Sequence, residues 1–187
     1  ECRARSCAFQ RALVGLYNLL GILRTAPPCG ATPAEVTLRI IDIEERIGRV
    51  EAAKRNLKML LFEPGDPSLG DEKKAELYVR LARVYTAAGR HSKALRMATR
   101  GFAKKLPERS LARLWEAIAA IHLDRNDAKK ALNYCLRGLS HAKGDDAAME
   151  RAGLRQLLAR IYRARGTYGL AIESLLQALE AVERAAG

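Results

Sequence analysis

One spacing of residues recurs four times along the chain and constrains its fold more than any other feature. In each copy an apolar pair is followed three residues later by a packed position, then four residues later by Gly or Asn, then five residues later by Ala. The copies repeat every 41, 37 and 40 residues, measured between Gly48, Gly89, Asn126 and Gly166. A fixed interior with connectors of variable length is typical of stacked helical hairpins.

The composition of the chain and its helix start and stop signals indicate that it is all-α. Ala, Leu and Arg dominate, hydrophobic residues make up 49% of the chain and aromatic residues only 5%, which is typical of globular helices. Thr32, Pro33 and Glu35 together form a helix start signal, and Asp71 is a second candidate cap. Pro27-Pro28 and the stretch from Pro64 to Pro67 break the pattern. We expect about nine helices, the first unpaired over about residues 3–25 and the other eight forming four antiparallel hairpins.

The repeated residue types have packing roles. Two helices joined by a short turn approach closely only where the facing residues are small, so Ala94, Ala131 and Ala171 are predicted to meet Ala82, Ala119 and Ala159. Gly89 and Gly166 supply a positive-φ turn, and Asn126 is the next-best residue for it. His122 takes the packed position that is Tyr in two other copies, and Trp115 and Cys135 are interpreted as core residues.

The pattern resembles the tetratricopeptide repeat. The matching residues are Tyr78, Leu81, Ala82, Tyr85, Gly89 and Ala94 in one copy, Trp115, Ile118, Ala119 and Ala131 in the next, and Leu158, Ala159, Tyr162, Gly166 and Ala171 in the last. The resemblance implies a right-handed superhelix with hairpins at about 33–65, 72–107, 109–143 and 146–186, preceded by an amphipathic helix within residues 1–30. The long period is similar to that of sensor and adaptor domains in bacterial signalling proteins.

The resemblance also implies a concave groove that is lined by the first helix of each hairpin and binds a peptide or helix of a partner protein. The residues expected to point into this groove are Arg39, Asp42, Arg80, Arg83, Glu116, Arg160 and Arg163. Arginine binds carboxylates bidentately, so an acidic protein or peptide is the expected partner. The Lys and Asn that form a carboxylate clamp in some members of the family are missing from this row.

The net charge of +12 leaves alternatives open. Residues 77–107 contain eight Lys or Arg and no acid, and residues 151–172 add five Arg and again no acid. The basic helices could be an ordinary solvated surface or could bind nucleic acid, although base stacking needs aromatic side chains that the repeat uses for packing. A small-ligand sensor is a further alternative.

Catalysis, metal binding and membrane insertion are not expected. The three His residues are isolated, the four Cys lack metal spacing, and the longest apolar stretch, residues 13–23, is too short to span a bilayer. We therefore expect a non-enzymatic protein without cofactors in the reducing cytoplasm. The first helix is either the second half of a truncated repeat, a cap or a segment lying in the groove. Open ends of the stack also allow a homo-oligomer, and the chain reads as a fragment of a longer protein.

Overall fold

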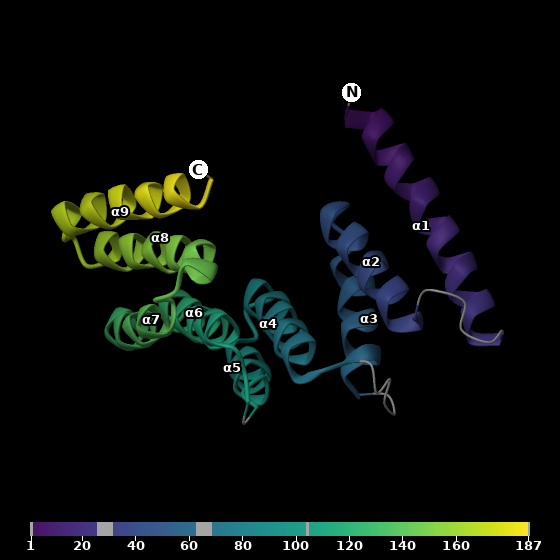
Figure 1. The fold of residues 1–187 in the computed structure, drawn as a ribbon, viewed down its shortest axis with the longest axis horizontal. Coiled ribbons are helices and arrows are strands. Elements are labelled where there is room, and N and C mark those ends of the chain that lie inside the picture. The colour runs from purple at the N-terminus through teal and green to yellow at the C-terminus, as the bar shows by residue number, and fades with distance from the viewer. Residues whose placement is uncertain (1, 26–31, 63–68, 104, 187) are drawn as a thin grey trace. The chain divides into compact units, whose positions relative to one another are not determined.

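The structure is a computed structural model that describes residues 2–25, 32–62, 69–103 and 105–186. These residues form nine α-helices, one short 3₁₀ helix and no strand (Figure 1). The prediction of an all-α fold is confirmed. The helices are α1 (Cys2–Thr25), α2 (Pro33–Arg46), α3 (Val50–Phe62), α4 (Asp71–Ala87), α5 (His91–Arg100), α6 (Glu108–Asp124), α7 (Ala128–His141), η1 (Asp145–Ala147), α8 (Ala148–Ala164) and α9 (Tyr168–Ala186).

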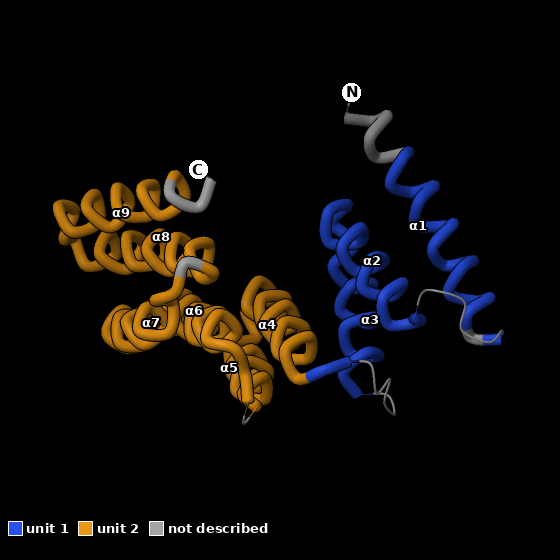
Figure 2. The backbone as a smooth tube through the Cα atoms, viewed as in Figure 1, with its two compact units in different colours: residues 1–70 blue, residues 71–187 orange. Residues whose placement is uncertain are grey.

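The chain divides into two compact units, residues 1–70 and 71–187 (Figure 2). The first unit therefore contains α1 together with the hairpin α2–α3, and the second contains the hairpins α4–α5, α6–α7 and α8–α9. The breaks at Pro27-Pro28 and at 64–67 lie outside the described residues.

Local signals set the ends of the helices as the sequence indicates. The side chain of Thr32 accepts a hydrogen bond from the backbone N–H of Glu35, whose carboxylate accepts one from the backbone N–H of Thr32. Each of the four hairpin turns contains a residue with positive φ, namely Gly48, Gly89, Asn126 and Gly166. The expectation that Asp71 caps α4 is wrong, because Asp71 is itself the first residue of that helix. There its charge still faces the positive end of the helix dipole.

The core of the first unit holds α1 against α2. The apolar side chains involved are Leu13, Leu16, Leu20, Leu23, Val36, Ile40, Ile43 and Ile47. Beside this core lies a polar group that joins all three helices. Tyr17 donates a hydrogen bond to the buried carboxylate of Glu44 (2.7 Å), and Asn56 donates to the same carboxylate (2.9 Å). Glu44 thus fills the Tyr position of its repeat with a hydrogen-bonded network that specifies where α1 sits.

Consecutive hairpins of the second unit pack closely because glycine faces the next helix. A Cβ at Gly101 would lie 2.5 Å from Leu114 Cδ2, and a Cβ at Gly138 would lie 2.6 Å from Leu154 Cδ2. The six alanines predicted at the close contacts within hairpins are all buried. In addition, α4 contacts α6 and α6 contacts α8, whereas no comparable contact joins α5 with α7 or α7 with α9. The first helices are therefore closer together than the second ones, and they line the concave side of this unit.

Candidate functional site

The predicted groove residues divide between the two units. Arg39 and Asp42 lie on α2 in the first unit, where Arg39 is exposed and Asp42 is half-buried. The others lie on the concave-side helices of the second unit, with Arg80 and Arg83 on α4, Glu116 on α6, and Arg160 and Arg163 on α8. The concave surface described below consists of the polar side chains of α4, α6 and α8 that face this side.

Ion pairs connect each concave-side helix to the next. Arg109 of α6 pairs with Glu72 of α4 at 2.6 Å, and Arg113 of α6 pairs with Glu150 of α8 at 2.6 Å. The side chain of Glu150 is almost fully buried, and the guanidinium of Arg113 is its ion-pair partner across the helix contact. The central part of the concave surface is therefore a charge-balanced ladder.

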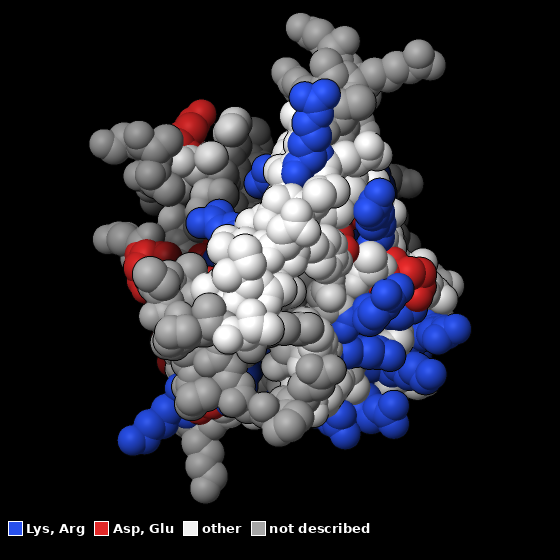
Figure 3. All heavy atoms as spheres, turned by 90° about the vertical axis from the view of Figure 1, so that its right-hand side faces the viewer, with Lys and Arg blue, Asp and Glu red and all other residues white. Residues whose placement is uncertain are grey.

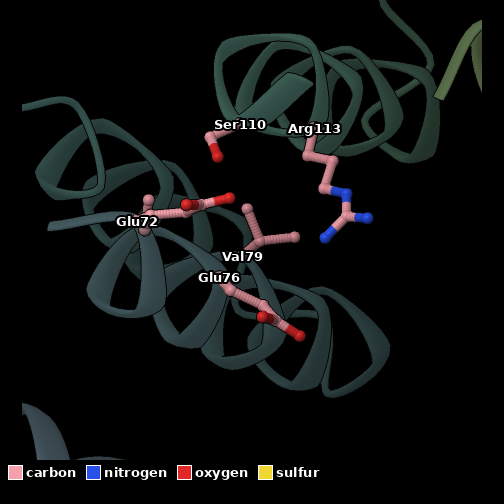
Figure 4. A pocket seen from close by; sticks show the side chains of 6 residues that line it. Glu72, Glu76, Val79, Ser110 and Arg113 are labelled. Atoms are coloured by element: carbon pink, nitrogen blue, oxygen red, sulfur yellow. The ribbon is translucent and has the colours of Figure 1, made fainter. Parts of the chain in front are cut away.

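A shallow pocket opens between α4 and α6 beside this ladder (Figure 4). Glu72, Glu76 and Val79 line it from α4, and Ser110 and Arg113 line it from α6. The pocket combines carboxylates, a hydroxyl and a guanidinium around the apolar side chains of Ala75 and Val79. Among these described lining residues, no nucleophile is paired with a base.

Two of the predicted arginines are only loosely paired. Arg83 lies 3.8 Å from the carboxylate of Glu116, and Arg160 lies 3.8 Å from that of Asp124. Both distances exceed the range of an N–H···O hydrogen bond, so these guanidinium groups retain donor capacity. Their side chains are 62% and 55% exposed, respectively. Arg80 is held differently, since it donates to Glu76 of the same helix at 3.1 Å.

Burial governs the electrostatics of Glu116. Desolvation raises the pKa of this carboxyl above its ordinary value, while the nearby Arg83 and Arg113 act in the opposite direction. A cation that approached this buried carboxyl more closely would stabilise its charged form. Glu116 therefore lies on the concave surface as the loosely paired partner of Arg83.

Sequence reasoning missed the ladder residues Arg109, Arg113 and Glu150. The sequence did contain a signal for them, because Glu72 and Arg109, like Arg113 and Glu150, are 37 residues apart. That separation equals the period between the second and third copies, so Glu72 and Arg109 occupy equivalent positions on neighbouring first helices, whereas Glu150 lies three residues before the equivalent of Arg113. Opposite charges at such positions predict an ion pair between consecutive repeats.

The residues interpreted as core are packed as expected. His122 is buried and stacks on Tyr134 with the ring centroids 5.1 Å apart, and burial lowers its pKa. Trp115 is half-buried between Phe102 and Tyr134. Cys135 is fully buried, donates to the backbone carbonyl of Leu154, and has a thiol pKa raised to about 12 by desolvation.

The described part of the chain contains neither a metal-ligand cluster nor a membrane-spanning helix. No group of three or more His, Cys, Asp or Glu side chains is placed to hold a metal ion there. Within the same residues, every helix is too short or too polar to cross a lipid bilayer.

Comparison with known proteins supports the repeat assignment. The model of the tetratricopeptide repeat family matches residues 154–187. Similar solved structures include a crystal structure of MamA (TM-score 0.62, 17% identity, covering 98% of this chain and 94% of that one). Another is BtubC (BKLC) from P. vanneervenii (TM-score 0.70, 16% identity, covering 99% of this chain and 77% of that one). At these identities the structures show a shared all-α solenoid fold. The sequence matches no curated protein.

Proposed function

We propose that the chain is a non-enzymatic protein-interaction module that binds an acidic peptide or helix along the concave surface; the match of residues 154–187 to the tetratricopeptide repeat model and the helical-hairpin fold support this. It would act as an adaptor or as the regulatory part of a larger signalling protein. The cysteine spacing of the sequence favours a reducing compartment such as the cytoplasm for this role.

The observation that carries the proposal is the loose pairing of Arg83 and Arg160. A carboxylate of a partner can approach each guanidinium and form the short, bidentate hydrogen bonds that Glu116 and Asp124 do not form at 3.8 Å. Arg163 lies three residues beyond Arg160 on α8 and is also exposed. The tight pairs of the ladder, in contrast, hold the helices in register and leave little donor capacity for a ligand.

The experiment compares two variants that remove the same charge from opposite sides of the second unit. Arg83→Ala/Arg160→Ala removes two cations from the concave surface, and Lys93→Ala/Lys129→Ala removes two exposed cations from the second helices α5 and α7. Partner proteins are captured at physiological salt with the unmodified chain, and their affinity for each variant is then measured.

We expect the concave-surface variant to bind the captured partner at least about tenfold more weakly, because each charge-assisted hydrogen bond contributes about 1.5 kcal/mol or more. The control variant should bind almost as well as the unmodified chain. Equal affinities for the two variants, with both folds intact by circular dichroism, would contradict the proposal.

A second candidate function is nucleic-acid binding by α5. Its exposed residues include Lys93 and Arg96, and no acid lies between residues 77 and 107. Binding through such a surface depends steeply on salt and loses several orders of magnitude in affinity when about six or more phosphate contacts are screened. Retention of a random oligonucleotide at physiological salt, and its loss in Lys93→Ala/Lys129→Ala, would favour this candidate over peptide binding.

A further inference from the structure

The last helix presents a continuous apolar face that no described residue covers. Five side chains of α9 form this face, with 37–66% of each exposed, and they are Tyr168, Ile172, Leu175, Leu179 and Val182. The steps between them alternate between four and three residues, which places them in one row along the helix and is the spacing of a coiled-coil seam. The opposite side of α9 holds small buried residues and packs on α8.

Inside the stack, the equivalent row of α7 is covered by a helix. Leu175 lies four residues after Ala171, as Cys135 lies four residues after Ala131, so the two positions correspond. Cys135 is fully buried, and its thiol donates a hydrogen bond to the backbone carbonyl of Leu154 on α8. The exposed row of α9 is therefore the type of face that a further helix covers elsewhere in this unit. Since Leu175 is larger than Cys135, the covering helix should present small residues.

The first helix has a row with the same spacing and with small residues. It consists of Ala8, Ala12, Gly15, Leu19 and Ile22, all exposed and separated alternately by four and three residues. A Cβ built at Gly15 meets nothing within 4 Å, so the space over this part of α1 is open. The face of the molecule nearest the viewer in Figure 3, on the side where Figure 1 shows α1, includes a broad uncharged area.

The charges of the two helices are complementary. Residues 2–25 contain four Arg and neither Asp nor Glu, whereas α9 contains Glu173, Glu180 and Glu183 and a single Arg at position 184. Pairing α9 with another α9 would bring carboxylates together, and pairing α1 with another α1 would bring arginines together. Opposite charges therefore favour α1 with α9 over either helix with a copy of itself.

We propose that this chain associates head to tail, with the α1 row of one copy packed on the α9 row of a second copy. The large side chains of α9 fit over Ala8, Ala12 and Gly15, and the net positive charge of the α1 sequence faces the net negative charge of α9. The two surfaces of such a contact differ, so each added copy leaves one free α1 row and one free α9 row. The assembly therefore grows beyond a dimer unless its rotation closes a ring.

Sedimentation velocity on the full chain, from about 1 to 100 μM, tests this directly because it detects micromolar dissociation constants. Leu175→Glu/Leu179→Glu blocks the α9 row, and Leu19→Glu/Ile22→Glu blocks the α1 row. We expect the unmodified chain to form species larger than a dimer and each blocked variant to be a monomer. An equimolar mixture of the two blocked variants should form a dimer and nothing larger, since it retains one intact pair of surfaces.

Leu136→Glu/Met149→Glu is the matched control, because these side chains are 48% and 64% exposed and lie outside both rows. This variant should associate like the unmodified chain, and circular dichroism should show an unchanged helix content for all variants. A chain that remains a monomer at every concentration would overturn the proposal. So would a dimer that persists when the α1 row is blocked, which would indicate an α9–α9 contact.

Discussion

Replacing Gly138 with Ala tests how tightly consecutive hairpins are packed. The added Cβ would lie 2.6 Å from Leu154 Cδ2, 3.2 Å from Leu154 Cδ1 and 3.3 Å from the Cβ of Trp115. Carbon atoms in good contact are about 3.5–4.0 Å apart, so α7 and α8 would have to separate or Leu154 would have to leave its rotamer. Leu154 is fully buried, so any such movement must be accommodated within the core.

The expected cost follows from two opposing terms. Overpacking of a buried contact costs about 1–3 kcal/mol, whereas exchanging Gly for Ala within a helix stabilises by about 1 kcal/mol. We therefore expect Gly138→Ala to lower the free energy of unfolding by about 1 kcal/mol. Gly153→Ala in α8 is the matched control, since its Cβ would meet Glu116 Oε1 at 3.5 Å, an ordinary contact. That variant should be more stable than the unmodified chain by up to about 1 kcal/mol.

Urea unfolding followed by circular dichroism measures both variants against the unmodified chain. We expect changes of opposite sign for the two glycines, with a difference of about 2 kcal/mol between their free energies of unfolding. If Gly138→Ala raised the stability as much as Gly153→Ala does, Leu154 would not be packed against Gly138, and the close stacking of α7 on α8 would be refuted.

Three further predictions concern buried polar groups. Tyr17→Phe should destabilise the first unit by about 1–2 kcal/mol in urea unfolding, because Glu44 loses a hydrogen bond, whereas the exposed Tyr168→Phe should change nothing. Burial lowers the pKa of His122 in the folded state, so the unfolded chain takes up the proton first. The contribution of neutral His122 to the free energy of unfolding should be fully present above about pH 6.5 and be lost as the pH falls below that value. His122→Tyr should show a smaller decrease in the free energy of unfolding between about pH 7.5 and 5.5 than the unmodified chain, and equal decreases would contradict this. With its thiol pKa near 12, Cys135 should resist a thiol reagent at pH 8 in a chain whose other cysteines are serine, and should react on unfolding; rapid labelling of the folded chain would contradict its burial.

The fold could be predicted from the sequence where short-range rules apply. Helix ends follow from local chemistry, as at Thr32 and Gly89, and the packing of His122 and Cys135 follows from their places in the repeat. Local rules misplace the start of α4 by one residue. The sequence predicts Asp71 as the residue that caps the helix, but Asp71 is the first residue of the helix itself. This one-residue difference does not require a tertiary contact, because the Asp71 carboxylate lies at the start of α4 whether Asp71 is the cap or the first helical residue.

The polar contacts between helices were harder to predict because they depend on the distance and register of neighbouring elements. Glu44 finds Tyr17 and Asn56 on two other helices, 27 and 12 residues away in the sequence. The arginines of the groove were predicted from their helical face, but their pairing was not. Whether an arginine is tightly held, as Arg113 is, or only loosely, as Arg83 is, depends on where the next helix places its carboxylate.

The most direct test of the central claim is to locate the bound partner on the second unit. A photo-crosslinking amino acid is placed at position 83 on the concave side or, in a second variant, at position 93 on α5, both exposed positions. Each variant is then irradiated with the partner captured by the unmodified chain. We expect a covalent adduct from position 83 and none from position 93. An adduct from position 93 alone would contradict it, because the partner would then bind the second helices rather than the concave surface.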